Sequence, residues 1–418
     1  MLAQARAYLF TNRTWGQTVL KNAAWIFVGE GVSRLLKLAA TFLIVRQFGP
    51  TDFGRFTFAF AVATMLSIAF DAGMVTVVTR EYAKDPAKAT SLPDMLGLKF
   101  TLGAVVMLVA VGVAFAVTGD RTITYMIVVL AAALFVGEIV NLGFAVIRAR
   151  QRMEYETLAR TASGLMLFGI VLGILWLAPT LGNISEAYLL AGVGTVAITA
   201  GMVANLRLPL TIRFRPRAWW PVLRVALPLA LYGVATTLYV NMDAAMLGFY
   251  GRLTEAGWYG AAIRVNGVVV VPMSIMGLVL FPALSQLDGA TFNRRWQMWA
   301  FGSAAVGVGL VVVLIAAAEP LVRLAFGADF EPAAGVLRVT ILGIGLMYAY
   351  FPWMQRLIIR DRQVLLLYIV GGAAILNAAL NAALIPSFGM YGAAWATVAT
   401  HAVIFGALVI VERRKAAR

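Results

Sequence analysis

Ionisable side chains within apolar segments are the residues of this sequence that require a chemical explanation. Three of them, Glu30, Arg34 and Lys37, lie at i, i+4 and i+7 in the apolar segment 22–46. At about 100° per residue in a helix, they fall within roughly 60° of one another on one face. Each would cost about 2.5–3.5 kcal/mol if it faced lipid. We therefore expect this face to contact protein or a water-filled cavity.

Two interpretations of this charged face are open. In the structural one, Glu30 pairs with Arg34 at i,i+4 spacing, and Asp71 from the next apolar segment joins them. In the functional one, Arg34 and Lys37 bind a phosphate group, because arginine offers a planar bidentate fork and lysine a point charge. Pairing of Glu30 with Arg34 leaves Lys37 uncompensated, which favours Arg34 and Lys37 as substrate-binding residues.

Arg264 is the third candidate for binding an anionic substrate. It lies at a depth comparable to that of Asp243 in the preceding apolar segment, so a salt bridge between them and a substrate contact both fit. Four deep acids are candidates for binding a coupling proton or sodium ion, with helix capping or structural pairing as the alternative: Glu30, Asp71, Glu138 and Asp243. They outnumber the three deep bases, so the sequence does not establish a strongly cationic cavity.

The remaining polar residues do not point to catalysis. Asn377 and Asn381, at i and i+4, fit interhelical hydrogen bonds, and His401 fits a packing residue better than a proton relay. The chain has no cysteine and one histidine, which excludes thiol chemistry and argues against zinc-dependent or histidine-based catalysis. It also lacks the G-x-x-x-x-G-K-[ST] nucleotide-binding loop. We expect no catalytic residue, no metal and no cofactor.

The elements that position these residues follow from composition. Of 418 residues, 61% are hydrophobic and 13% are charged, whereas soluble proteins have about 25% charged residues. A soluble enzyme is excluded, and the continuous apolar runs exclude a β-barrel. Twelve segments exceed the length of roughly 18 residues that a transmembrane helix needs: 22–46, 53–79, 93–117, 123–147, 159–179, 187–206, 222–249, 258–286, 298–318, 334–358, 364–385 and 391–411.

The distribution of basic residues predicts the orientation of these segments. The net charge is +15, and 24 of the 34 lysines and arginines lie at the chain ends or around the loops after even-numbered segments, against five on the opposite side. This asymmetry follows the positive-inside rule. It predicts that both termini are cytoplasmic, and it explains the basic composition without nucleic acid as a partner.

The two halves of the chain resemble each other, which indicates a duplication. Similar loop residues recur in the same order at offsets of 203, 212 and 207: 51–56 with 254–259, 147–151 with 359–363, and 177–182 with 384–389. Repeats of six spans keep the same topology, so we expect two parallel repeats. The expected organisation is a cytoplasmic segment 1–21, a lobe 22–206, a cytoplasmic linker 207–221, a lobe 222–411 and a cytoplasmic tail 412–418.

Several loop motifs run through most of the chain: Val45-Arg46-Gln47-Phe48-Gly49-Pro50-Thr51-Asp52-Phe53-Gly54, Asp243 with Leu247-Gly248 and Glu255-Ala256-Gly257-Trp258-Tyr259, Phe281-Pro282, Leu324-Ala325-Phe326-Gly327, and Asn377, Asn381, Ile385-Pro386, Gly389 and Gly392-Ala393-Ala394. Together these motifs resemble those of polysaccharide (O-antigen and exopolysaccharide) flippases of the multidrug/oligosaccharidyl-lipid/polysaccharide exporter superfamily. One departure is Met242, where relatives often carry arginine before the position of Asp243.

This resemblance implies a carrier and not an enzyme. It implies an all-α integral membrane protein of the cytoplasmic (inner) membrane, with twelve transmembrane helices as two six-helix repeats around a central cavity. Its substrate would be an oligosaccharide linked to a polyprenyl pyrophosphate, flipped to the outer leaflet by alternating access. Its other partners would be membrane lipids, a coupling H⁺ or Na⁺, and polysaccharide polymerase machinery. The alternatives are a cation-coupled drug or metabolite antiporter of the same superfamily and, with less support, a membrane glycan polymerase or ligase.

Overall fold

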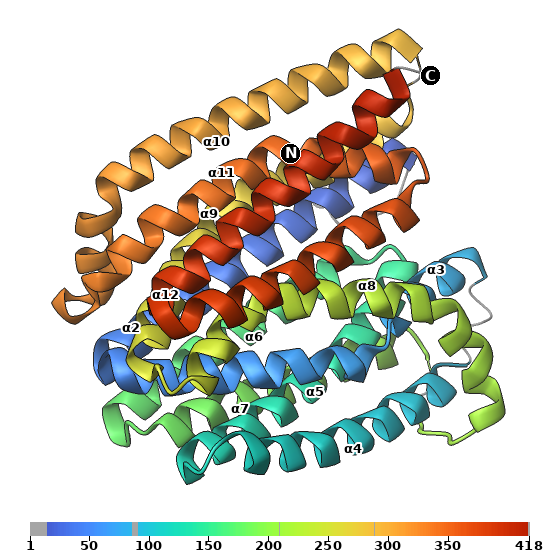
Figure 1. Cartoon of the computed structure of the whole chain (residues 1–418). Coiled ribbons are helices and arrows are strands. Elements are labelled where there is room, and N and C mark those ends of the chain that lie inside the picture. Colours follow the sequence, from blue (N-terminus) through green and yellow to red (C-terminus); the bar gives the residue numbers. More distant parts are fainter. Residues whose placement is uncertain (1–14, 86–90, 209, 288, 417–418) are drawn as a thin grey trace, which may run out of the picture. The chain divides into compact units, whose positions relative to one another are not determined.

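The computed structural model describes residues 15–85, 91–208, 210–287 and 289–416, and these segments are almost entirely helical (Figure 1). The expected all-α class is confirmed. The helices are α2 (Trp15–Asp71), α3 (Met74–Lys84), α4 (Leu92–Val117), α5 (Arg121–Ala149), α6 (Met153–Leu177), α7 (Leu181–Asn205), α8 (Pro216–Phe249), α9 (Leu253–Ser285), α10 (Gly289–Phe326), α11 (Pro332–Ile359) and α12 (Gln363–Ala416), with the 3₁₀ turn η2 (Ala328–Phe330).

Two of these helices are longer than one membrane crossing. In the described part of the chain, nine helical runs are long and apolar enough to span a membrane, and a pair bent by 58° within α8 makes a tenth. The runs Ala24–Lys84 and Gln363–Glu412 contain 61 and 50 residues, although about 20 suffice for one span. Each turns at a left-handed glycine, Gly49 with φ 69° or Gly389 with φ 56°. Each run therefore makes two spans, which gives the expected twelve.

The chain forms two compact units. The N-terminal unit contains residues 1–47 and 62–234, and the C-terminal unit contains residues 48–61 and 235–418. None of the three divisions falls in the expected linker 207–221: one lies within α8, and the other two lie within α2. The lobe boundaries taken from the sequence stay a prediction.

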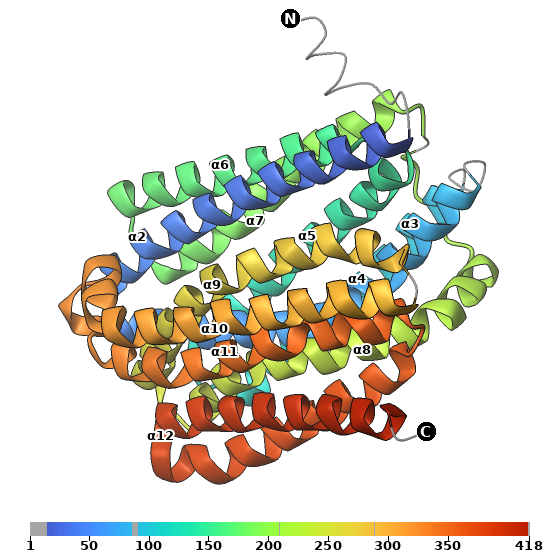
Figure 2. The ribbon, with the colours of Figure 1, turned by 90° about the horizontal axis from the view of Figure 1, so that it is seen from above.

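The N-terminal unit has an apolar core that runs from α3 to α8. Met74, Leu98, Leu142 and Val203 are at most 2% exposed and pack together with other side chains of α3, α4, α5 and α7. Figure 2 shows the first part of α2 lying beside α6. A Cβ at Gly29 would come within 2.8 Å of the Thr157 backbone. This close packing holds the charged face of α2 against the start of α6.

The C-terminal unit is built around α9, α10 and α11. Met273, Ile341 and Tyr348 form one buried cluster, and the Ser303 hydroxyl donates a 2.6 Å hydrogen bond to the Tyr348 carbonyl. The segment 48–61 of α2 packs on the start of α9, where the Thr51 and Thr254 hydroxyl oxygens lie 2.8 Å apart. This segment thereby lies next to Arg264.

The end of α5 and the end of α11 carry the same turn, which supports the internal duplication. Arg152 N–H donates to the Ile147 carbonyl at 3.2 Å, and Arg362 N–H donates to the Leu357 carbonyl at 2.9 Å. The residue before each donor, Gln151 or Asp361, has φ 56°, as a Schellman-type helix end requires. Equivalent residues here are 210 apart and not 212, so the sequence match at these loops was shifted by two residues.

Candidate functional site

The charged face of α2 meets the first turns of α6. Arg34 donates from Nε to Glu30 Oε1 at 2.9 Å, and its Nη2 lies 2.8 Å from the same oxygen. Arg160 of α6 approaches the other carboxylate oxygen of Glu30 at 3.4 Å. The i,i+4 pair expected from spacing is present, but Arg160 is its third member. Asp71, expected to join it, binds Lys99 instead.

Glu156 extends this group of charges along α6. Its carboxylate is buried and accepts hydrogen bonds from Arg148 at 2.7 and 2.5 Å, and from Arg160 Nε at 2.9 Å. The Arg160 guanidinium also lies over the Phe144 ring, 4.9 Å from its centroid. Arg160 is therefore fixed between two acids and an aromatic ring.

Six charged residues from α2, α5 and α6 form this group, which we call the α2–α6 cluster. Their positive and negative charges are not equal in number. The acids are Glu30 and Glu156, and the bases are Arg34, Lys37, Arg148 and Arg160, which gives a net charge of +2 from two acids and four bases. Lys37 is exposed, and its ammonium makes no hydrogen bond or ion pair with the residues that the structure describes. The Arg34 side chain is also 48% exposed. An exposed cationic surface with unused N–H donors fits an anionic group such as phosphate.

Sequence inspection missed Arg148 and Arg160 because both were assigned to a cytoplasmic loop. A signal was present: Arg160 follows Glu156 by four residues, at the spacing of a helical ion pair. The structure shows that α6 already begins at Met153. The helix therefore begins six residues before the expected start of this span.

The acids Asp71 and Glu138 are brought together by Lys99 of α4. Lys99 Nζ donates to Asp71 Oδ1 at 2.8 Å and to Glu138 Oε2 at 2.9 Å, and the Lys99 side chain is fully buried. Asn141 donates to the other Glu138 oxygen at 3.0 Å. Asp71 also accepts from Val75 N–H, across the left-handed Ala72–Gly73 break that separates α2 from α3. The position between the two carboxylates is thus filled by an ammonium of the chain itself.

Asp243 of α8 has a different environment, although it was predicted to have the same role. Its carboxylate accepts from Asn381 at 2.5 Å, from the Thr397 hydroxyl at 2.6 Å, and from the Tyr259 hydroxyl. The bond from Asn381 of α12 to Asp243 of α8 is interhelical, as expected for Asn381, whereas Asn381 also donates to Asn377 at 3.1 Å within α12. Within the described part of the chain, all the donors to Asp243 are neutral side chains, and the salt bridge considered with Arg264 is not formed.

Arg264 of α9 lines a cavity of about 190 Å³ within the C-terminal unit. Its Nη1 donates to the Gly260 carbonyl at 3.1 Å, and its guanidinium lies 4.8 Å from the Phe53 ring centroid. Arg34 and Lys37 belong to the N-terminal unit and Arg264 to the C-terminal unit. Their joint use of one substrate stays a prediction.

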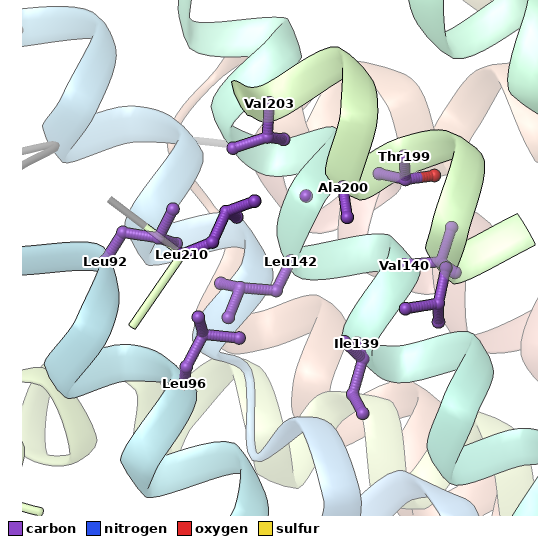
Figure 3. Close-up of a pocket in the computed structure, with 11 residues that line it drawn as sticks. Leu92, Leu96, Ile139, Val140, Leu142, Thr199, Ala200, Val203 and Leu210 are labelled. Carbon is purple, nitrogen blue, oxygen red and sulfur yellow. The ribbon is translucent and has the colours of Figure 1, made fainter. Parts of the chain in front are cut away.

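A smaller cavity in the N-terminal unit lies between α4, α5 and α7, and it is apolar. Its volume is about 50 Å³. Figure 3 shows leucine, isoleucine and valine side chains around it, with Thr199 as the labelled residue that carries a side-chain oxygen. No ionisable side chain belongs to its lining, so this cavity does not fit a charged headgroup.

His401 is held as a packing residue. Its two ring nitrogens lie 3.1 Å from the Tyr239 hydroxyl and 2.8 Å from the Tyr350 hydroxyl, and the residue is buried. Both nitrogens therefore have hydrogen-bond partners within the C-terminal unit.

Known structures share this fold at low sequence identity. The lipid II flippase MurJ, in an inward closed conformation, superposes with a TM-score of 0.74 and 14% identity over 93% of this chain and 87% of MurJ. An inward-facing multidrug resistance MATE family transporter of the MOP superfamily gives a TM-score of 0.72 and 14% identity over 92% of this chain and 95% of that protein. These likenesses confirm the two-lobe fold with twelve transmembrane helices.

One curated relative is similar in sequence. It is the probable low-salt glycan biosynthesis flippase Agl15 of Haloferax volcanii, which is 26% identical over 178 residues. The match spans 40% of this chain and about a third, 36%, of the relative's length.

The family follows from a longer match. The protein-family model described as "Polysaccharide biosynthesis protein" matches residues 19–288, which is more than half of the chain. The relatives reported above are named as flippases and transporters, and the long apolar helices of the described residues are those of a multi-pass membrane protein. The chain belongs to the polysaccharide biosynthesis protein family that the resemblance of its loop motifs had indicated.

Proposed function

We propose that this protein flips a lipid-linked oligosaccharide, carried on a polyprenyl pyrophosphate, from the cytoplasmic to the outer leaflet of the cytoplasmic membrane by alternating access. A pyrophosphate cannot cross hydrocarbon without a polar path. The observation that carries the proposal is the α2–α6 cluster, in which Arg34 and Lys37 are exposed while the surrounding charges leave a net positive surface. The names of the flippase relatives support the substrate class.

In this proposal Arg34 and Lys37 bind the pyrophosphate, and Arg148, Glu156 and Arg160 position Glu30 and Arg34. Both termini are cytoplasmic, and the two lobes, 22–206 and 222–411, rock about the linker 207–221. Polysaccharide polymerase machinery would receive the product on the outer face.

Transport by reconstituted protein tests this assignment. Vesicles carrying an oligosaccharide on undecaprenyl pyrophosphate would be assayed for its appearance in the outer leaflet. Arg34→Gln and Lys37→Gln should each lower the rate about 10- to 100-fold, since a hydrogen bond to a charged group contributes about 1.5–3 kcal/mol. Arg34→Lys should retain part of the rate, because the charge stays while the bidentate fork is lost.

The matched control is Arg121→Gln, which removes an exposed arginine at the start of α5 in the same unit. Its transport rate should stay near that of the unmodified protein. If the double change Glu30→Gln with Arg34→Gln transports normally, Arg34 has a packing role only and the phosphate assignment is wrong.

Cation-coupled export of a smaller amphipathic compound is the second candidate function. It is favoured by Asp243, a buried carboxylate whose donors are all neutral. This function predicts transport of a compound that lacks both phosphate and glycan, with unchanged activity in Arg34→Gln.

A further inference from the structure

The wall of the cavity beside Arg264 contains a buried hydroxyl without a hydrogen-bond partner among the described residues. Thr57 lies on segment 48–61 of α2 and is 5% exposed. Its Oγ1 has no hydrogen-bond partner among the residues that the structure describes, and Thr57 lines the cavity. A buried hydroxyl without a partner costs about 1–3 kcal/mol. A ligand in the cavity would supply the missing hydrogen bond.

The other lining groups indicate what kind of ligand fits. Asn241 bonds from Nδ2 to the Thr237 carbonyl at 2.9 Å, so its side-chain oxygen is available as an acceptor. Phe60, Tyr259 and several aliphatic side chains form the apolar part of the wall. Arg264 is a single cation, and one of its N–H groups already bonds to Gly260. Few polar groups in a mostly apolar wall are typical of a site for a small uncharged or weakly charged molecule.

We propose that this cavity binds one sugar ring of the lipid-linked substrate, with Thr57 and Asn241 bonding to ring hydroxyls and Arg264 at its edge. A sugar ring presents hydroxyl groups around its rim and C–H groups on its faces, which matches hydroxyl, amide and aromatic wall groups. A pyrophosphate would need several N–H donors or cations, and the wall offers one guanidinium. This inference rests on the proposed function and assigns the glycan, not the headgroup, to the C-terminal unit.

Gly260 lies against Thr57 in the cavity wall. A Cβ at Gly260 would lie 2.7 Å from Thr57 Oγ1 and 2.8 Å from Thr57 Cγ2. Gly260→Ala should therefore displace the Thr57 side chain into the cavity. On the same helix, a Cβ at Gly267 would have no neighbour within 4 Å, which makes Gly267→Ala the matched control.

Binding of two lipids to the purified protein tests the proposal. The probes are undecaprenyl pyrophosphate without sugar and undecaprenyl pyrophosphate carrying one N-acetylhexosamine. Thr57→Val should weaken binding of the sugar-bearing lipid about 3- to 10-fold, as expected for one lost neutral hydrogen bond, and leave the sugar-free lipid unchanged. Gly260→Ala should weaken binding of the sugar-bearing lipid at least as much, and Gly267→Ala should weaken binding of neither lipid.

Unfolding measurements separate a binding role from a structural one. Because the Thr57 hydroxyl has no hydrogen-bond partner in the described part of the chain, Thr57→Val should not lower the melting temperature. The proposal would be overturned if Thr57→Val lowers the melting temperature. It would also be overturned if this change weakens binding of both lipids equally, or of neither. Arg34→Gln should weaken both lipids equally; if it weakens neither while Thr57→Val weakens the sugar-bearing lipid, the headgroup assignment fails and the sugar site stands.

Discussion

Two acid sites within apolar segments, one in each unit, look alike in sequence and differ in chemistry. Asp71 and Glu138 of the N-terminal unit share the ammonium of Lys99, whereas Asp243 of the C-terminal unit is surrounded by hydroxyl and amide donors. The Lys99 ammonium already compensates the first pair, and no cation among the residues that the structure describes bonds to the carboxylate of Asp243. The comparison teaches that an intramembrane acid becomes a candidate for ion coupling only after its neighbours are known.

The largest expected effect is on Lys99. Lys99→Met leaves two carboxylates facing each other without the ammonium, and breaking a buried ion pair typically costs about 3–5 kcal/mol. We expect that loss in the free energy of unfolding, measured by denaturation in detergent. Adding Asp71→Asn and Glu138→Gln should recover most of it. A loss under about 1 kcal/mol would mean that the triad of Asp71, Lys99 and Glu138 does not stabilise the fold through its ion pairs.

The second effect concerns the neutral donors around Asp243. Asp243→Ala leaves Asn381 Nδ2 and two hydroxyls without their acceptor, which should lower stability by about 2–3 kcal/mol in the same assay. Asp243→Asn keeps an acceptor oxygen of the same shape and should cost about 1 kcal/mol. If Asp243→Asn is as damaging as Lys99→Met, the contrast between the two sites is wrong.

Removing one acid of the triad should matter less. Asp71→Asn leaves Lys99 paired with Glu138, so we expect a change of about 0–1 kcal/mol in the unfolding free energy. The control is Glu138→Gln, which leaves the alternative pair. A much larger cost for Asp71→Asn alone would show that its bond to Val75 N–H, at the break before α3, dominates.

The smallest effect is expected at the exposed pair on α2. The Arg34 and Glu30 side chains are 48% and 37% exposed, and pairs of this kind contribute about 0–1 kcal/mol. Glu30→Gln should therefore leave the melting temperature nearly unchanged at high salt. A large destabilisation would favour the structural interpretation of this face over phosphate binding.

Sequence patterns predicted the fold well because hydrophobic length is a strong signal. The segment 93–117 lies within one residue of α4, and the apolar runs could not form another class of structure. The breaks were harder to place. Ala72 and Gly73 interrupt the expected span 53–79. This break was not predicted, because a left-handed residue such as Ala72 carries no composition signal.

The site was predicted less completely, for a different reason. Glu30 and Arg34 are four residues apart, so helix geometry alone pairs them. Lys99 was not among the candidates from the sequence, yet it contacts acids 28 and 39 residues away. Such contacts depend on which helices pack together, and a single sequence does not contain that information.

The division of α2 has a consequence for modularity. The chain passes between units at 47/48, 61/62 and 234/235, so the first half of the gene encodes a piece of the other half's structure. That piece places the Thr51 hydroxyl against the Thr254 hydroxyl and the Phe53 ring against the Arg264 guanidinium. A protein cut in the linker 207–221 would leave a C-terminal fragment without the ring under its own arginine. The two repeats are therefore not interchangeable parts: a swap of halves between homologues must keep residues 48–61 with the C-terminal half.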